Sequence, residues 1–323
     1  MKTHLSESKK NYYVKIINFL RAIASLGVCA IHISYGTGLY KIKLADRFIS
    51  FGQQGVPIFF VISGFIIPYS LWNSNYETKD FFRYLFKRAL RIDPPYLVVI
   101  LICILTGGCA FDWVKLILHV GYLIPFFKSQ QWYQGVFWTL GIEFQYYVII
   151  GLGFRFIKTN NNYLLLLILL LLPITSYFLP SNIPTGFIIK HLHYFCFGIV
   201  CCLYLKGKIN FIQAHIWFGL LTLFLCISIS ITTGLIGYFT SLSILYLNFS
   251  TKATDFLGKI SYSLYLVHIF VGGWVINFFS PYIENIFILF ILTIVFCILF
   301  ATVFYYLVEK PAFEYSKRYK LNK

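Results

Sequence analysis

Long apolar runs separated by short polar segments recur along almost the whole 323-residue chain. A helix that crosses a membrane needs about 20 mainly apolar residues, and in lipid its backbone polar groups must be satisfied within the helix. The pattern therefore predicts an all-α, polytopic transmembrane bundle of about ten spanning helices. The predicted spans are residues 16–36, 53–72, 92–108, 137–157, 163–179, 190–205, 212–230, 234–250, 260–279 and 286–308.

One further apolar segment, 112–127, is broken by Asp112, Lys115, His119 and Pro125. We expect it to form an interfacial or re-entrant stretch outside the membrane core. If it crossed the membrane instead, every later helix would reverse its direction.

Composition agrees with this class of protein. Hydrophobic residues make up 59% of the chain and charged residues 12%, whereas soluble domains carry roughly 25% charged residues. The eight cysteines lie mostly in apolar runs without paired CxxC spacing, which favours packing over disulfide or metal roles. We predict no metal site and no tightly bound cofactor.

Positive charge indicates the orientation, because cytoplasmic loops are enriched in Lys and Arg. With the N-terminus inside, 21 of the 27 Lys and Arg residues fall on the inner side of the ten-span topology. Both termini are therefore predicted to be cytoplasmic. The net charge of +16 is explained by topology and does not require a nucleic-acid partner. We expect a single integral membrane domain over 1–323, with a cytoplasmic segment 1–15 and a basic cytoplasmic tail 309–323.

Polar residues form a stripe on the first predicted helix. Arg21 and His32 are eleven residues apart, which is three turns plus about 20°, so they share one face and lie about 16 Å apart along the axis. Asn18 and Ser25 fall on the same face. Ionisable groups inside spans are costly and are functional candidates by default. The alternative is a snorkelling arginine and a histidine that bonds to a neighbouring helix.

Among the other ionisable residues inside predicted spans, Glu143 is the only acid well inside one, and His268 lies on an otherwise apolar helix. Glu143 is at a depth comparable to that of His32, and a buried carboxylate needs a partner, so we expect His32 or an arginine beside it; a simple hydrogen bond between helices is the alternative. His268 lies near mid-membrane, where packing and an accessory functional role both stay open.

A basic segment precedes the third predicted span. Arg88 and Arg91 are three residues apart, so on a helix they project together and could clamp phosphates. Contact with anionic lipid explains the same charges equally well.

Six short blocks follow one another along most of the chain: Asn18–Ala24 with His32, Gly55–Phe65 (GVPIFFVISGF), Arg88–Pro94 (RALRIDP), Trp138–Glu143 (WTLGIE), Ser261–His268 (SYSLYLVH) and Glu309–Pro311 (EKP). In this order they resemble the membrane-bound acyltransferase 3 family, whose members O-acylate glycans and other acceptors. Two departures are Asn18, where the family often has Asp, and Asp93, where it often has an aromatic residue.

The resemblance implies an O-acyltransferase of the cell (cytoplasmic or inner) membrane. It implies acyl-CoA, most simply acetyl-CoA, as a cytoplasmic co-substrate and a cell-surface glycan or lipid-linked saccharide as the outer acceptor. His32 would be the general base or acyl carrier, assisted by Glu143. Donor-binding and possible accessory residues follow from the same blocks: Arg21, Arg88 and Arg91 for the donor, and Asn18, Ser261, Tyr262, Tyr265 and His268 as accessories.

Two alternatives stay open at this point. The polar stripe also suits a non-enzymatic carrier of sugars or lipids, although no internal repeat indicates an inverted-repeat transporter. An acyltransferase that uses succinyl groups or a small-molecule acceptor is the other.

Overall fold

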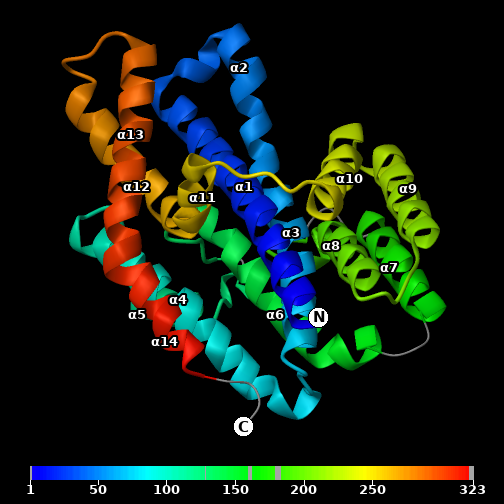
Figure 1. Cartoon of the computed structure of the whole chain (residues 1–323). Coiled ribbons are helices and arrows are strands. Elements are labelled where there is room, and N and C mark those ends of the chain that lie inside the picture. The colour runs from blue at the N-terminus through cyan, green and yellow to red at the C-terminus, as the bar shows by residue number, and fades with distance from the viewer. Residues whose placement is uncertain (1, 128, 159–161, 179–182, 320–323) are drawn as a thin grey trace.

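A computed structural model describes residues 2–127, 129–158, 162–178 and 183–319, and within these ranges all regular secondary structure is helical, with no strand (Figure 1). The prediction of an all-α fold is therefore confirmed. The first half contains α1 (Lys2–Thr37), α2 (Lys43–Ile49), α3 (Gly55–Asn73), α4 (Phe81–Leu105), α5 (Trp113–Val120), α6 (Trp138–Lys158) and α7 (Asn162–Tyr177). The second half contains α8 (Leu192–Leu205), α9 (Phe211–Ser228), α10 (Ile231–Tyr246), α11 (Lys252–Lys259), α12 (Ser261–Phe279), α13 (Ile286–Phe304) and α14 (Lys310–Lys317).

The helices have the lengths and composition of a multi-pass membrane protein. Six are long and apolar enough to cross a bilayer: Lys15–Thr37, Lys43–Asn73, Gly135–Lys158, Phe211–Ser228, Ser261–Phe279 and Ile286–Lys317. Three shorter apolar helices, Leu164–Ile174, Leu192–Leu205 and Ile231–Tyr246, coincide with three more of the expected spans. The remaining expected span, 92–108, falls on α4, which begins at Phe81.

The segment 112–127 does not form a spanning helix. Its only α-helix among the described residues is α5, whose eight residues rise about 12 Å, against a hydrocarbon core of about 30 Å. Asp112 caps this helix by accepting a hydrogen bond from the backbone N–H of Lys115 at 3.0 Å. The segment thus has the short, interrupted form expected of an interfacial or re-entrant stretch.

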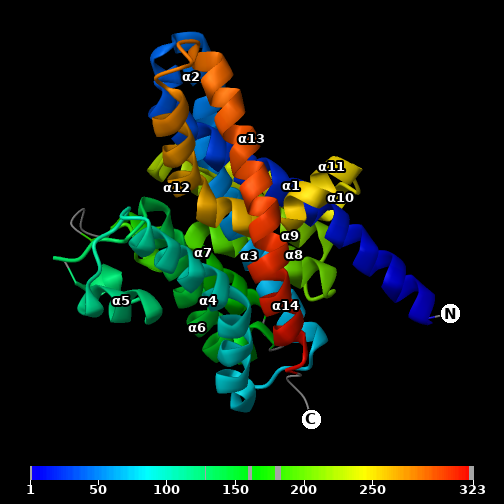
Figure 2. The same cartoon turned by 90° about the vertical axis from the view of Figure 1, so that its left-hand side faces the viewer.

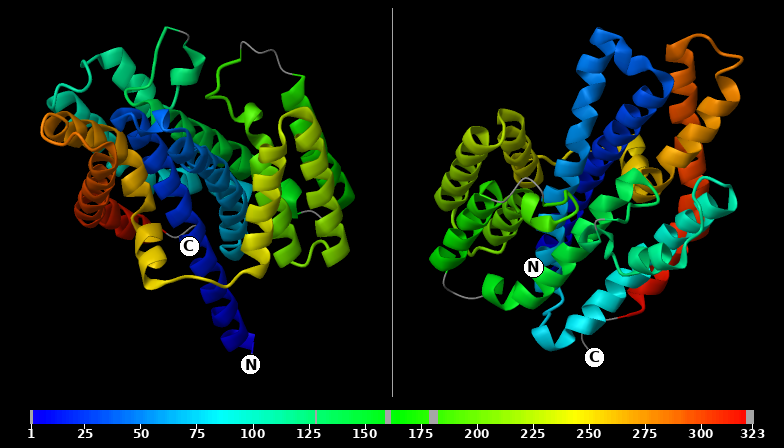
Figure 3. Two further views of the ribbon diagram at one scale, coloured as in Figure 1. Left: turned by 90° about the horizontal axis from the view of Figure 1, so that it is seen from above. Right: turned by 180° about the vertical axis from the view of Figure 1, so that it is seen from behind.

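Two apolar cores divide the bundle. One gathers side chains mainly of α3, α6, α7, α8, α9 and α10, the other mainly those of α4, α12 and α13, and α1 contributes to both. In Figures 1 and 3, α7 to α10 stand together on one side and α12 and α13 on the other, with α1 and α3 between them. Val56 on α3 packs against both cores. The candidate site lies along this junction.

The two ends of the chain are more structured than their polar sequences predict. The segment 1–15 belongs to α1 from Lys2 onward, and Figure 2 shows this part of the helix projecting from the bundle. The basic segment that begins at 309 continues as α14, which packs along α4. Tyr319 contacts Phe86 of α4 with ring centroids 5.3 Å apart. Residues 320–323 of the expected tail lie outside the described residues.

Candidate active site

Two cavities lie one above the other along α1. The first, of about 240 Å³, is lined by Arg21 among other residues, and the second, of about 400 Å³, is lined by His32. The eleven residues between them correspond to about 16 Å along the helix. The predicted stripe is interrupted, however, because the Ser25 hydroxyl turns back to the carbonyl of Ala22 at 3.2 Å and is buried.

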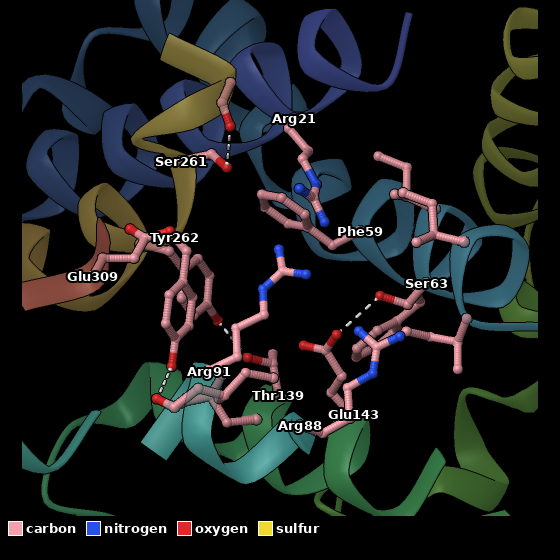
Figure 4. Close-up of a pocket in the computed structure, with 18 of the residues that line it drawn as sticks. Arg21, Phe59, Ser63, Arg88, Arg91, Thr139, Glu143, Ser261, Tyr262 and Glu309 are labelled. Atoms are coloured by element: carbon pink, nitrogen blue, oxygen red, sulfur yellow. Dashed lines mark hydrogen bonds between the residues drawn. The ribbon is translucent and has the colours of Figure 1, made fainter. Parts of the chain in front are cut away.

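Three arginines converge on the first cavity, which we call the arginine cavity. Figure 4 shows the guanidinium groups of Arg21, Arg88 and Arg91 pointing into it, one from α1 and two from α4. The i, i+3 spacing puts Arg88 and Arg91 on one face of α4, as predicted. Aromatic rings support both: Arg88 lies 5.4 Å from the ring centre of Tyr147, and Arg91 lies 4.8 Å from that of Phe313.

Two carboxylates line the same cavity, and both are held by hydroxyl and amide donors. Glu143 accepts hydrogen bonds from Ser63 at 3.1 Å and from Tyr147 at 2.6 Å. Glu309 accepts from the backbone N–H of Ser263 at 3.0 Å and from its hydroxyl at 2.5 Å.

Neither carboxylate neutralises an arginine by direct contact. Within the described residues, no ion pair of 4.0 Å or less joins Glu143 or Glu309 to Arg21, Arg88 or Arg91. The three guanidinium groups therefore keep their donors available for an anionic ligand, and planar guanidinium forks match phosphate geometry.

Four of the five predicted accessory residues, all except His268, also line the arginine cavity, but their polar groups are engaged in hydrogen bonds within the protein. Asn18 donates to Asp255 of α11 at 3.2 Å, Ser261 donates to the carbonyl of Gly258 at 2.9 Å, and Tyr262 donates to the carbonyl of Ile92 in α4 at 2.8 Å. A Cβ at Gly258 would lie 2.3 Å from the Asn18 carbonyl oxygen, so glycine is what lets α11 lie against α1.

The second cavity is lined by two histidines, His32 and His191, and we call it the histidine cavity. His191 lies with its Nε2 3.0 Å from the carbonyl oxygen of Thr185. The Nδ1 atom of His32 lies 2.9 Å from the carbonyl oxygen of Val28 and 3.1 Å from Nε2 of His268. His268 is fully buried, and its own Nδ1 lies 2.8 Å from the carbonyl oxygen of Tyr265. The two imidazole rings have centroids 5.1 Å apart.

This arrangement assigns the tautomers. A carbonyl oxygen can only accept, so Nδ1 of His268 carries hydrogen and its Nε2 is the acceptor in the neutral ring. Nδ1 of His32, which faces two acceptors, must then carry hydrogen as well. The lone pair of His32 is left on Nε2, which has no hydrogen-bond partner among the described residues. A basic nitrogen is therefore free in the ring that lines the histidine cavity.

The predicted site residues thus separate into two groups. The arginine cavity is lined by Asn18, Arg21, Arg88, Arg91, Glu143, Ser261, Tyr262 and Tyr265. His32 lines the other cavity, and Tyr265 lines both.

Glu143 is not the partner of His32; of the alternatives left open for this carboxylate, the structure shows the hydrogen bond between helices, from Ser63 of α3 to Glu143 of α6. Glu143 makes its hydrogen bonds to Ser63 and Tyr147 and none to His32, and the ring that contacts His32 is His268. Asp93, the unusual acid of the basic segment, accepts a hydrogen bond from Tyr122 at 2.8 Å and does not line the arginine cavity.

Sequence reasoning missed Glu309 as a site residue, although its EKP block carried the signal. Glu309 ends a π-helical turn, η7 (Tyr305–Glu309), between α13 and α14. Such turns are rare and occur frequently at functional sites. Ser63, Thr139 and Phe313 were missed as well; the first two lie inside blocks that the sequence had already marked.

The comparison with protein families agrees with this geometry. The model of the acyltransferase 3 family, described as an acyltransferase domain, matches residues 14–306. Searches of curated proteins and of solved structures each found no match. The matched region includes all helices from α2 to α13 and every lining residue of the two cavities except Glu309 and Phe313. The chain belongs to the acyltransferase 3 family and is a membrane O-acyltransferase.

Proposed function

We propose that this enzyme transfers an acetyl group from cytoplasmic acetyl-CoA to a hydroxyl of a cell-surface glycan, or of its lipid-linked precursor, at the outer side of the cell membrane. The observation that carries the proposal is that three arginines without a direct ion pair to either cavity carboxylate adjoin a histidine whose Nε2 is free, in neighbouring cavities along one helix. The charge asymmetry of the loops supports the orientation, since it assigns the basic end of the bundle to the cytoplasm.

The arginine cavity would bind the donor. Its volume of about 240 Å³ is below the roughly 300–1,000 Å³ typical of pockets for whole drug-sized ligands. It therefore suits the phosphate-bearing arm of a CoA ester better than the complete molecule. Arg21, Arg88 and Arg91 would pair with the phosphates, while Glu143 and Glu309 limit the net positive charge of the empty cavity.

The histidine cavity would bind the acceptor hydroxyl. His32 Nε2 takes the hydroxyl proton as the oxygen attacks the thioester carbonyl, the C–O bond forms and the C–S bond breaks. The proton then passes from the imidazolium to the departing thiolate, which leaves as CoA thiol. A neutral imidazole is suited to this exchange near pH 7. His268 would hold Nδ1–H of His32 and so keep the basic nitrogen directed at the substrate.

A covalent relay is compatible with the same tautomer. Nε2 would attack the thioester itself, form an acyl–nitrogen bond and release CoA, and the acceptor oxygen would then displace the imidazole. In both routes the reacting atom of the protein is His32 Nε2. Glu143 acts in donor binding under this proposal and not as the group that orients His32.

The decisive experiment uses purified protein in proteoliposomes with isotopically labelled acetyl-CoA on the side of the basic loops. Release of CoA thiol should depend on a saccharide acceptor on the opposite side. Mass spectrometry of surface glycan from cells with and without the gene should show one acetyl ester fewer per repeat in the deleted strain. Identical glycan in both strains, together with no CoA release, would refute the proposal.

A further inference from the structure

The wall between the two cavities consists of side chains that line both of them. Val56 and Phe60 of α3 and Tyr265 of α12 are the residues common to the two linings. An acyl group that travels from the arginine cavity to His32 must pass these three side chains. They present hydrocarbon and aromatic surface, and the single hydroxyl among them is already hydrogen-bonded.

Tyr265 is fixed in this wall. Its hydroxyl donates to the carbonyl of Val136 at 2.9 Å and lies 2.7 Å from the hydroxyl of Thr139. Its ring meets that of Phe59 edge-on, with centroids 6.0 Å apart. A hydroxyl that already donates to a carbonyl and contacts a second hydroxyl is poorly placed to donate a proton to substrate. Tyr265 therefore contributes a fixed surface to the wall.

Phe60 is fixed by aromatic neighbours. Its ring stacks on Phe195 of α8 with centroids 5.0 Å apart and lies within 5.5 Å of the ring of His191 and 6.3 Å of that of Trp138. Only 3% of Phe60 is exposed. Moving this ring would disturb the packing of α3 on α8, so it too sets a rigid edge.

Val56 is the smallest of the three side chains, and its backbone is fixed. A Cβ at the preceding residue, Gly55, would lie 2.4 Å from the carbonyl oxygen of Ala24, so α3 is pressed against α1 at this point. The side chain of Val56 is half-buried and packs against both apolar cores. A change of one or two methyl groups here would alter the opening without moving the helices.

We propose that Val56, with Phe60 and Tyr265 as its rigid frame, limits the length of the acyl chain that can reach His32, and so selects short, uncharged acyl groups. The inference rests on the proposed transfer between the two cavities and adds to it a class of donor. The wall excludes longer acyl chains by steric hindrance, because it offers little free space. The wall excludes a carboxylated chain such as succinyl by the cost of desolvating its charge, because the three side chains provide no partner for a carboxylate.

The test compares kcat/KM for acetyl-, butyryl- and succinyl-CoA in four proteins: the native enzyme, Val56→Ala, Val56→Ile and Val61→Ala. One methylene in an apolar pocket is worth about 10- to 200-fold in discrimination. Val56→Ala should therefore raise the butyryl-to-acetyl ratio at least about 10-fold, and Val56→Ile should lower it. The succinyl-to-acetyl ratio should rise much less in Val56→Ala, because a larger opening does not solvate a carboxylate.

Val61→Ala is the matched control. It is the same truncation on the same helix, at a fully buried residue that lines neither cavity. Ratios between donors are insensitive to partial unfolding, so a loss of active protein does not obscure the result. If the native enzyme transfers acetyl groups but Val56→Ala and Val61→Ala have equal butyryl-to-acetyl ratios of kcat/KM, the selection of acyl groups by Val56 is refuted and the proposed function stands. If the native enzyme uses no acyl-CoA, the proposed function itself fails.

Discussion

The arginine cavity and the histidine cavity use polar groups in different ways. In the first, six charged side chains from five helical elements face a small space, and the two carboxylates bond to hydroxyls and an amide without pairing directly with a guanidinium group. In the second, one histidine is backed by another and surrounded mainly by apolar and aromatic residues. The first arrangement is suited to binding an anion and the second to moving a proton. Substitutions in one cavity should therefore change binding, and those in the other should change the chemical step.

The largest effect is expected for His32→Ala. Loss of a general base typically costs about 10²–10⁴-fold in rate, and loss of a covalent carrier would cost at least as much. The variant should keep its thermal stability in detergent and its affinity for acyl-CoA, because His32 does not line the arginine cavity. The measurements are acetyl transfer under saturating donor and acyl-CoA binding by calorimetry. Activity within a few-fold of the native enzyme would contradict both roles of His32.

His268→Gln should give the next largest loss, about 10- to 100-fold in kcat. Mutation of a residue that hydrogen-bonds to a metal-ligating histidine and orients its ring typically has an effect of this size, and His268 orients His32 in a similar way. Without the His268 ring, His32 can rotate and place its hydrogen on either nitrogen. The KM for acyl-CoA should stay unchanged, and the pH dependence of kcat should shift, which a purely structural role would not produce.

His268→Phe provides the matched comparison for that prediction. It fills similar volume but offers no acceptor for Nδ1–H of His32. Equal kcat values and equal pH profiles for the native enzyme and both variants would show that His268 contributes only to packing.

Arg88→Ala and Arg91→Ala should act mainly on the KM for acyl-CoA. A charge-assisted hydrogen bond contributes about 1.5–3 kcal/mol, which corresponds to roughly a 10- to 150-fold rise. Lys87→Ala is the control, since Lys87 is a neighbouring cation of α4 that does not line the cavity. An unchanged KM in the double arginine variant would assign these charges to topology and lipid contact.

Glu143→Gln distinguishes the two cavities most directly. The carboxylate belongs to the arginine cavity and bonds to Ser63 and Tyr147, so its neutralisation should change donor affinity several-fold. The pH profile of kcat should follow His32 and remain where it is in the native enzyme. A displaced profile with unchanged KM would show that Glu143 acts on His32 after all, as the sequence had predicted.

The smallest effect concerns the segment that leads into Gly135, Val136 and Trp138, three lining residues of the histidine cavity. His119 in α5 lies outside the spanning segments; its Nδ1 donates to the carbonyl of Lys115 at 2.7 Å and its Nε2 accepts from the N–H of Tyr133 at 2.9 Å. Burial lowers the pKa of His119 to about 4, below the value of about 6.5 in the unfolded chain. The unfolded form therefore binds more protons between these values, and stability is lost as pH falls from about 6.5 towards 4.

Hydrogen exchange, corrected for its intrinsic pH dependence, should report this loss. Residues 132–138, which follow the His119 contact and include lining residues of the histidine cavity, should become less protected at pH 5 than at pH 7. His119→Gln removes the titrating group and should reduce the difference. The same pH dependence in the variant and the native protein would exclude His119 as its source.

Much of the architecture could be predicted from residue patterns. Apolar runs predicted an all-α membrane bundle, and the i, i+3 spacing correctly put Arg88 and Arg91 on one face of a helix. The ordered motifs identified the family that the comparison shows. Spacing within one helix is fixed by backbone geometry, which is why the separation of Arg21 and His32 needed no tertiary information.

The pairing of side chains from different helices could not be predicted in the same way. Estimated depth in the membrane put Glu143 beside His32, but depth gives one coordinate and leaves the rotation and neighbours of each helix undetermined. Packing of α12 against α1 brought His268 to His32, although 236 residues separate them in the chain. A lone histidine in an apolar run gives no sign of the partner it will meet.

The sequence by itself therefore determined the class of protein, the positions of its helices and the family to which it belongs, because hydrophobic length, helical periodicity and ordered motifs are properties of the chain alone. Only the tertiary structure decided which groups share a cavity, which nitrogen of His32 is free and which side chains separate donor from acceptor. Those outcomes depend on how helices rotate and approach one another, and that is fixed by packing between residues far apart in the chain.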